Sequence, residues 1–177
     1  MKLFLVCLLS VFAVATSMNV KFKDCGSKLA EDVVVDVKPC TAEPCSLKQG
    51  SNYTISMSFT TKTMVSAIGA KIYGVLGGVP VPFPFDHPNA CEDSGLNCPL
   101  QNATKATYTA TLPIKSEYPA IKLYVKWELV DNDKENSDQD LTCVEIPVAV
   151  VASNSVEPKL EFGAHKVKVV RNGNGYW

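Results

Sequence analysis

The chain has 177 residues, of which 46% are hydrophobic, and its seventeen basic and eighteen acidic side chains give a formal charge of −1. This length suits about one domain, the hydrophobic content excludes extended disorder, and the charge balance lacks the basic excess typical of nucleic-acid binders. The two histidines, His87 and His165, leave little material for histidine-based catalysis.

The first seventeen residues have the pattern of a secretory signal peptide. A short positive start at Met1 and Lys2 leads into an apolar run over residues 3–15, which ends in the small residues of Ala13-Val14-Ala15. The run is too short to cross a bilayer of about 30 Å as a helix, so an uncleaved anchor is the less favoured alternative. We therefore expect residues 1–17 to be removed, leaving a soluble domain over 18–152 in the extracellular space or the lysosomal lumen.

The first strands of this domain are predicted over Val20–Phe22, Asp32–Val37 and Tyr53–Phe59. In the third, apolar residues alternate with threonine and serine, as is typical of an antiparallel strand with one buried face. The sequence Asn52-Tyr53-Thr54 at its start is an N-glycosylation motif, so Asn52 is a predicted glycan site.

A fourth strand is predicted over Ser66–Val75, and a proline-rich segment follows it over residues 77–88. Prolines alternate there with Val81, Phe83 and Phe85, which predicts an extended segment that cannot join a central ladder. Two interpretations stay open for it. It is either a rigid connector whose aromatic rings cap the core or a preshaped apolar rim around a ligand entrance.

The next strand is predicted over Ala106–Leu112, after a second glycosylation motif that begins at Asn102. Residues 112–119 are expected to form a turn that exposes two apolar side chains, Ile114 and Tyr118.

The clearest alternation covers Ala120–Leu129, whose odd-numbered residues are apolar while Lys122, Lys126 and Glu128 occupy the polar face. The acidic stretch at residues 131–140 fails the calcium-loop pattern, because Asn136 stands where glycine is required. We interpret it as a solvated hairpin that leads into a last strand over Leu141–Val151.

About seven short strands with turn signals between them, and no long amphipathic helix, predict an all-β sandwich of two sheets. The segment after it, residues 153–177, holds a basic alternating stretch and a glycine-rich end. It is interpreted as a flexible extension, with a patch for anionic membranes as the alternative.

The chain has seven cysteines, and loss of Cys7 with the signal segment would leave an even number. Six cysteines in an exported domain indicate a disulfide framework, for which fifteen pairings exist. The pairs Cys40/Cys45 and Cys91/Cys98 each bound a short turn-rich loop that could close on itself, which would leave Cys25 and Cys143. No paired C-x-x-C motif supports a zinc site, and no metal or cofactor is expected.

Together these features resemble the MD-2-related lipid-recognition (ML) family, and within it the Niemann–Pick type C-2 sterol carriers. The resemblance covers roughly residues 20–152. The matching stretches are Phe22–Ser27, Pro39-Cys40, Pro44-Cys45, Gly78–Pro84, Ser94–Pro99, Leu112–Pro119 and Cys143–Val148.

The resemblance implies an immunoglobulin-like β-sandwich with an apolar cavity between its sheets and the disulfides Cys25–Cys143, Cys40–Cys45 and Cys91–Cys98. It also implies a monomeric, non-enzymatic carrier of a sterol, fatty acid or similar lipid, with a membrane surface or a membrane sterol transporter as partner. The implied pocket positions are Phe83, Ile114 and Tyr118. Further expected lining or supporting residues are Tyr53, Val75, Val81, Pro119, Leu123 and Trp127.

Two other function classes compete with the carrier. An innate-immune or chemosensory recognition protein would use the same pocket for microbial lipids or small apolar signals. An enzyme is disfavoured because the chain lacks the Gly-x-Ser-x-Gly and His-Glu-x-x-His motifs and a free thiol in the mature domain.

Overall fold

The computed structural model describes residues 18–132 and 139–154 of the chain. The predicted signal segment, the centre of the acidic hairpin at 133–138 and most of the C-terminal extension lie outside these ranges. Within them, no helix is long and apolar enough to cross a membrane.

The described residues form ten β-strands. Their bounds are β1 Met18–Asn19, β2 Lys23–Asp24, β3 Ala30–Lys38, β4 Cys45–Lys48, β5 Ser51–Thr61, β6 Ile68–Leu76, β7 Val79–Pro82, β8 Lys105–Ile114, β9 Lys122–Asp131 and β10 Gln139–Val151. The six longer strands confirm the six predicted from alternation and β-propensity. The strand predicted over Val20–Phe22 is not found at these residues, so this prediction was wrong. The chain there forms the two-residue strands β1 and β2 on either side, and Val20 between them is a buried core residue.

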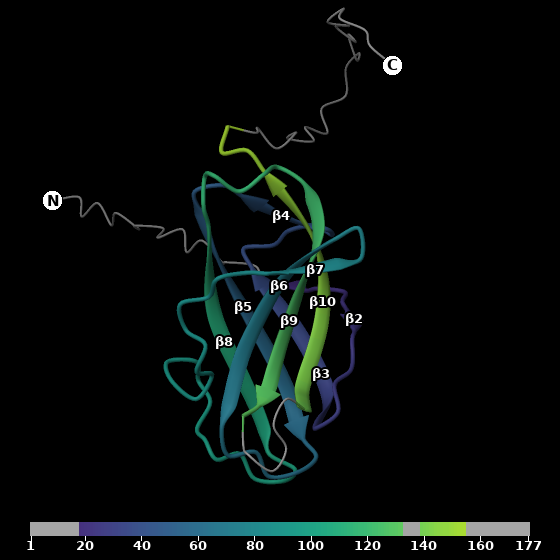
Figure 1. Cartoon of the computed structure of the whole chain (residues 1–177), viewed down its shortest axis with the longest axis vertical. Coiled ribbons are helices and arrows are strands. Elements are labelled where there is room, and N and C mark those ends of the chain that lie inside the picture. The colour runs from purple at the N-terminus through teal and green to yellow at the C-terminus, as the bar shows by residue number, and fades with distance from the viewer. Residues whose placement is uncertain (1–17, 133–138, 155–177) are drawn as a thin grey trace, which may run out of the picture.

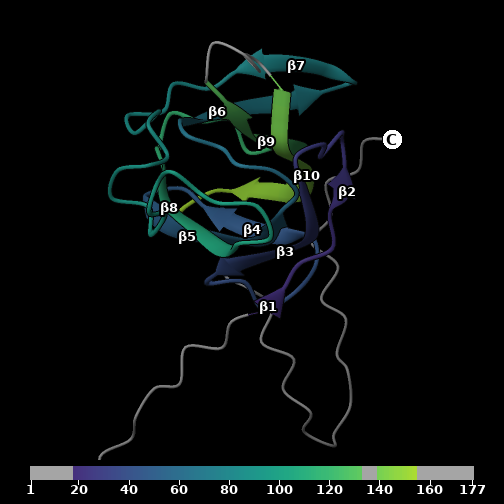
Figure 2. The ribbon, with the colours of Figure 1, turned by 90° about the horizontal axis from the view of Figure 1, so that it is seen from below.

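The strands build two sheets that face each other (Figures 1 and 2). A four-stranded sheet has the order β1-β3-β5-β8, and a six-stranded sheet has the order β2-β10-β9-β6-β7 with β4 also paired to β10. Figure 2 shows the layers nearly end-on, with β6, β7 and β9 on one side and β3, β5 and β8 on the other. All pairs are antiparallel except β4 with β10. The predicted all-β sandwich is confirmed.

Strand β7 lies in the proline-rich segment, for which no strand was predicted from the sequence. It pairs with β6 on one side only, at the edge of the sheet. In an antiparallel edge strand alternate N–H groups point to the neighbour or to solvent. Pro80 and Pro82 therefore occupy the solvent-facing positions, whereas Phe83 N donates to Ile72 O at 2.9 Å. Alternating prolines thus leave this edge without donors for another chain.

The core lies between the sheets and follows the predicted alternation. Tyr53, Ile55, Met57 and Phe59 of β5 are all buried. On the outer face of the same strand, Ser58 Oγ lies 2.9 Å from Thr107 Oγ1 of β8. Trp127 of β9 is fully buried at the centre of the sandwich. The apolar odd-numbered residues of β9 thus face the core, as predicted.

The three disulfides implied by the family resemblance are present in the structure. Cys25–Cys143 joins residues 118 positions apart and ties the start of the domain to β10. Cys40–Cys45 and Cys91–Cys98 close loops with separations of 5 and 7 residues. Cys25 N also donates to Cys143 O at 2.9 Å, so backbone and side chains hold the same junction.

Candidate functional site

A cavity of about 260 Å³ opens between the two sheets at the end of the sandwich where β4 and β7 lie. We call it the apolar cavity, because Tyr73 and Tyr118 carry the only polar side-chain atoms among its lining residues. The wall comes from both sheets and from the segments after β7 and β8. Its residues are Leu47, Ile72, Tyr73, Gly74, Leu76, Val81, Pro82, Phe83, Pro84, Leu112, Ile114, Tyr118, Pro119, Ile121, Leu123, Val125, Val148 and Val150.

Six of the nine residues named from the sequence are on this wall. Phe83, Tyr118 and Pro119 come from loops, Val81 from β7, Ile114 from β8 and Leu123 from β9. The expectation that Ile114 is exposed on a turn was wrong. It is 4% exposed because β8 continues through Pro113, where Ser51 of β5 pairs with Ile114.

The other three named residues lie off the wall. Val75 of β6 does not line the cavity, although its neighbours Gly74 and Leu76 do. Tyr53 is in the core, and its hydroxyl donates to Ser46 O at 2.9 Å and accepts from Lys48 N at 2.8 Å. Trp127 packs against two other aromatic rings deeper between the sheets.

Several wall residues were not singled out from the sequence. Leu112 and Val125 could have been found by extending the apolar faces of the predicted strands toward the same end of the sandwich. Leu47 could not, because its approach depends on the parallel pairing of β4 with β10. That pairing joins a four-residue strand to a distant segment and has no local sequence signal.

Two aromatic rings from different loops meet at the apolar cavity. The centroids of Phe83 and Tyr118 are 5.5 Å apart, with the ring planes at 72°. Both backbones are fixed, since Phe83 N donates to Ile72 O and Gln49 Nε2 donates to Tyr118 O at 2.5 Å. This edge-to-face pair is stabilised mainly by packing. The rings can therefore separate without breaking a backbone hydrogen bond.

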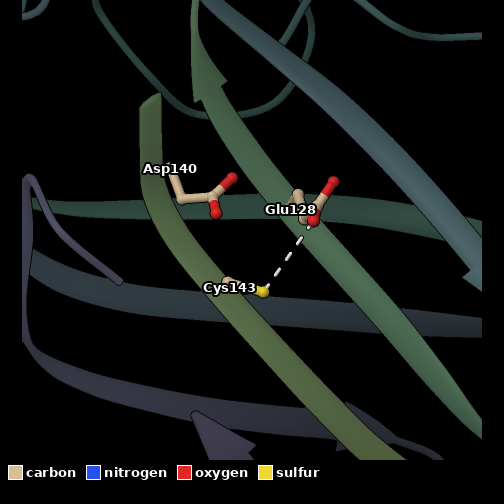
Figure 3. Close-up of side chains that lie close together, drawn as sticks. All are labelled: Glu128, Asp140 and Cys143. Atoms are coloured by element: carbon tan, nitrogen blue, oxygen red, sulfur yellow. Dashed lines mark hydrogen bonds between the residues drawn. The ribbon is translucent and has the colours of Figure 1, made fainter. Parts of the chain in front are cut away.

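Two carboxylates and a sulfur lie together on the six-stranded sheet (Figure 3), on residues that do not line the apolar cavity. Glu128, Asp140 and Cys143 bring two carboxylates and a sulfur close together. Cys143 Sγ lies 3.9 Å from Glu128 Oε1, but this sulfur is in a disulfide and carries no proton or ligating thiolate. Glu128, predicted on the exposed polar face, is 8% exposed and pairs with Lys126. The group is therefore interpreted as structural.

Burial raises the pKa of the Asp140 carboxyl, and repulsion from Glu128 raises it further by a smaller amount. Three nearby lysines act in the opposite direction. A carboxyl whose pKa is higher in the folded state than in the unfolded state contributes stability below its unfolded pKa, and this is lost as pH rises through the folded value. At neutral pH the Asp140 charge therefore destabilises the fold.

We expect Asp140→Asn to raise the melting temperature at pH 7 by about 2–4 °C, since an exposed or half-exposed charge contributes up to about 1 kcal/mol. As pH is lowered from 7 to 4 the gain should shrink, because the raised pKa lets the wild-type carboxyl take up its proton before a carboxyl of ordinary pKa does. Thermal melts across this range measure the effect. The matched control is Glu117→Gln, which removes the same single charge from an exposed turn. A gain that is constant with pH would contradict this origin.

Both predicted glycosylation sites are accessible. Asn52 on the outer side of β5 and Asn102 in the turn before β8 are exposed. Glycan attachment at each site stays a prediction.

Comparison with known proteins covers the same domain. The family model described as ML domain matches residues 19–150. The NPC intracellular cholesterol transporter 2 of Danio rerio is 42% identical over 146 residues, which cover 82% of this chain and 95% of that protein. The ecdysteroid-regulated 16 kDa protein of Manduca sexta is 42% identical over 145 residues, covering 80% and 97%. The crystal structure of a Niemann-Pick type C2 protein from the Japanese carpenter ant has a TM-score of 0.65 and 34% identity, covering 74% of this chain and 99% of that one.

Proposed function

The chain belongs to the ML-domain family, and we propose that it is a carrier that holds a sterol, fatty acid or similar apolar lipid in the apolar cavity and transfers it between membranes or proteins. One observation carries the proposal. The cavity between the sheets is lined almost wholly by apolar side chains and has an opening. The names of several relatives, as cholesterol transporters, agree with this activity.

The energetics suit reversible carriage. Burial of roughly 400 Å² of lipid surface at about 25 cal/mol per Å² contributes about 10 kcal/mol before ordering costs. These costs leave an affinity between micromolar and nanomolar, tight enough to hold a lipid and weak enough to release it. The cavity volume of about 260 Å³ is slightly below the range of small-molecule pockets, about 300–1,000 Å³. A sterol-sized ligand therefore needs the Phe83 and Tyr118 rings to move apart.

Exposed apolar side chains beside the opening support transfer at a surface. Leu76, Val79 and Val81 of the β6–β7 hairpin are 42%, 62% and 49% exposed, and Leu76 and Val81 also line the cavity. Such a group of apolar residues next to a ligand entrance favours contact with a membrane or a membrane transporter during transfer.

The disulfides and the predicted signal segment support an exported compartment. Three disulfides are stable in an oxidising environment. We propose that the protein is exported to the extracellular space or the lysosomal lumen and works there as a monomer without catalytic activity. The Danio rerio relative is named as a transporter, which agrees with a non-enzymatic role.

Native mass spectrometry of the protein secreted from cells, after removal of glycans, tests the carrier function. We expect an added mass in the sterol or acyl range that disappears after extraction with organic solvent. Protein that is always empty and copurifies with a tight protein partner would contradict the carrier and favour a recognition protein.

A further inference from the structure

The turn between β4 and β5 is hydrogen-bonded to three segments that carry wall residues of the apolar cavity. Gln49 N donates to Val151 O at 2.9 Å, at the end of β10. Gly50 N donates to Ile114 O at 2.6 Å, at the end of β8. The third bond comes from a side chain, since Gln49 Nε2 donates to Tyr118 O at 2.5 Å. Because β10 and β8 belong to different sheets, this two-residue turn bridges the sandwich at the end where the cavity opens.

The turn itself is held in place on both sides. Gly50 has a φ of 78°, a left-handed conformation that favours glycine. On the β4 side, the buried Tyr53 hydroxyl accepts from Lys48 N at 2.8 Å and donates to Ser46 O at 2.9 Å. The Gln49 side chain, which is half-buried, therefore extends from a fixed base.

Residues 115–121, which we call the mouth loop, depend on this side chain for their position. The loop joins β8 to β9, and its residues Tyr118 and Ile121 line the apolar cavity. Its C-terminal end is fixed, because Val150 N donates to Ile121 O at 2.9 Å. Tyr118 N donates only to a carbonyl oxygen within the loop, at 3.3 Å. Among the hydrogen bonds between described residues, the one from Gln49 ties the middle of the loop to another element.

A wide ligand needs the mouth loop to move. Rotation of the Phe83 and Tyr118 side chains separates their two rings and gives room for a single acyl chain. A rigid sterol with four fused rings is wider than such a chain, and the cavity of about 260 Å³ is slightly smaller than most small-molecule pockets. We therefore expect sterol entry to need a shift of the Tyr118 backbone, which the bond from Gln49 opposes.

We propose that the Gln49 side chain is a latch on the mouth loop and regulates how fast a sterol enters and leaves the apolar cavity. The proposal rests on the carrier function given above. With the bond made, the loop holds the Tyr118 ring against Phe83. With the bond broken, water replaces the amide at the Tyr118 carbonyl, and the loop moves outward. Since exchange of a neutral hydrogen bond for water changes the free energy little, the latch slows sterol exchange without preventing it.

The variant Gln49→Glu tests the latch, because glutamate has nearly the same shape but no N–H to donate to the Tyr118 carbonyl. Loss of the bond from the closed state should raise the rates of sterol uptake and sterol release by about fivefold each. The dissociation constant should change by less than about twofold, because the bond is made in both the empty and the loaded closed protein. Exchange of a fatty acid, which needs only ring rotation, should be unchanged.

Stopped-flow transfer to vesicles of neutral phosphatidylcholine measures these rates, with dehydroergosterol as the fluorescent sterol and parinaric acid as the fluorescent fatty acid. In the empty protein, amide hydrogen exchange of residues 115–121 should also be faster in Gln49→Glu, and this measurement does not depend on lipid. Wild-type protein that takes up neither lipid would contradict the carrier function. Unchanged hydrogen exchange, or an unchanged rate of sterol release, in Gln49→Glu would overturn the latch.

Two further variants make the test specific. Gln49→Lys is the conservative rescue, since its ammonium group keeps N–H donors for the same carbonyl, and it should exchange sterol near the wild-type rate. The matched control is Gln101→Glu, which makes the same chemical change at an exposed position that does not line the apolar cavity. If either variant exchanges sterol as fast as Gln49→Glu, or if Gln49→Glu accelerates fatty acid and sterol equally, the donor on Gln49 does not control the mouth loop and the proposal is overturned.

Discussion

Removal of the Cys25–Cys143 disulfide, by replacing both residues with alanine, is expected to lower the free energy of unfolding by about 4–5 kcal/mol. The bond joins residues 118 positions apart, and in the chain-entropy model a closure of this length restricts the unfolded state by that amount. This is a large share of the roughly 5–15 kcal/mol that stabilises a typical domain. Urea unfolding at 25 °C, followed by tryptophan fluorescence, measures the loss.

The matched control is the double replacement of Cys40 and Cys45, whose separation is only 5 residues. The same model gives about 2 kcal/mol for a loop this short. The long closure should therefore cost about twice as much as the short one. Equal losses would show that local packing around the sulfurs, and not the length of the closed loop, determines the stabilisation.

Alternation along single strands predicted most of the fold. In β5 and β9 the period of two identified both the strand and its buried face, because one face of each strand packs on the opposite sheet. Strands β4 and β7 were not predicted for different reasons. β4 has four residues and depends on its parallel contact with β10. β7 has its apolar and proline residues in alternation, but all four residues are exposed, so no buried face marks it as a strand.

The candidate site shows the limit of the same reasoning. Alternation tells which face of β9 is buried, but the apolar cavity occupies only one end of the sandwich. Leu123 and Val125 lie at that end and line the cavity, whereas Trp127, on the same face, lies beyond it in the solid core. Glu128 shows a second limit, since its burial beside Lys126 and Asp140 depends on the neighbouring strand.

Truncation of the Phe83 ring, by Phe83→Ala, is expected to weaken lipid binding by up to about 2–3 kcal/mol, or roughly 30- to 150-fold. The ring lines the apolar cavity, and its loss removes apolar contact with a ligand in the opening. The backbone should stay in place, because Phe83 N donates to Ile72 O at 2.9 Å and does not depend on the side chain. Tyr118→Ala should act similarly, since its ring packs edge to face against Phe83.

Displacement of a fluorescent sterol or fatty acid measures the affinity, with thermal melts of each variant run beside it. The matched control is Tyr124→Ala, because Tyr124 is a large aromatic residue on β9 that is 48% exposed and does not line the apolar cavity. It should bind lipid as wild type does. If Phe83→Ala and Tyr118→Ala bind as tightly as Tyr124→Ala while all three melt near the wild-type temperature, the ligand does not pass between these two rings. The proline-rich segment would then be a rigid connector, and the lipid site would have to lie elsewhere in the domain.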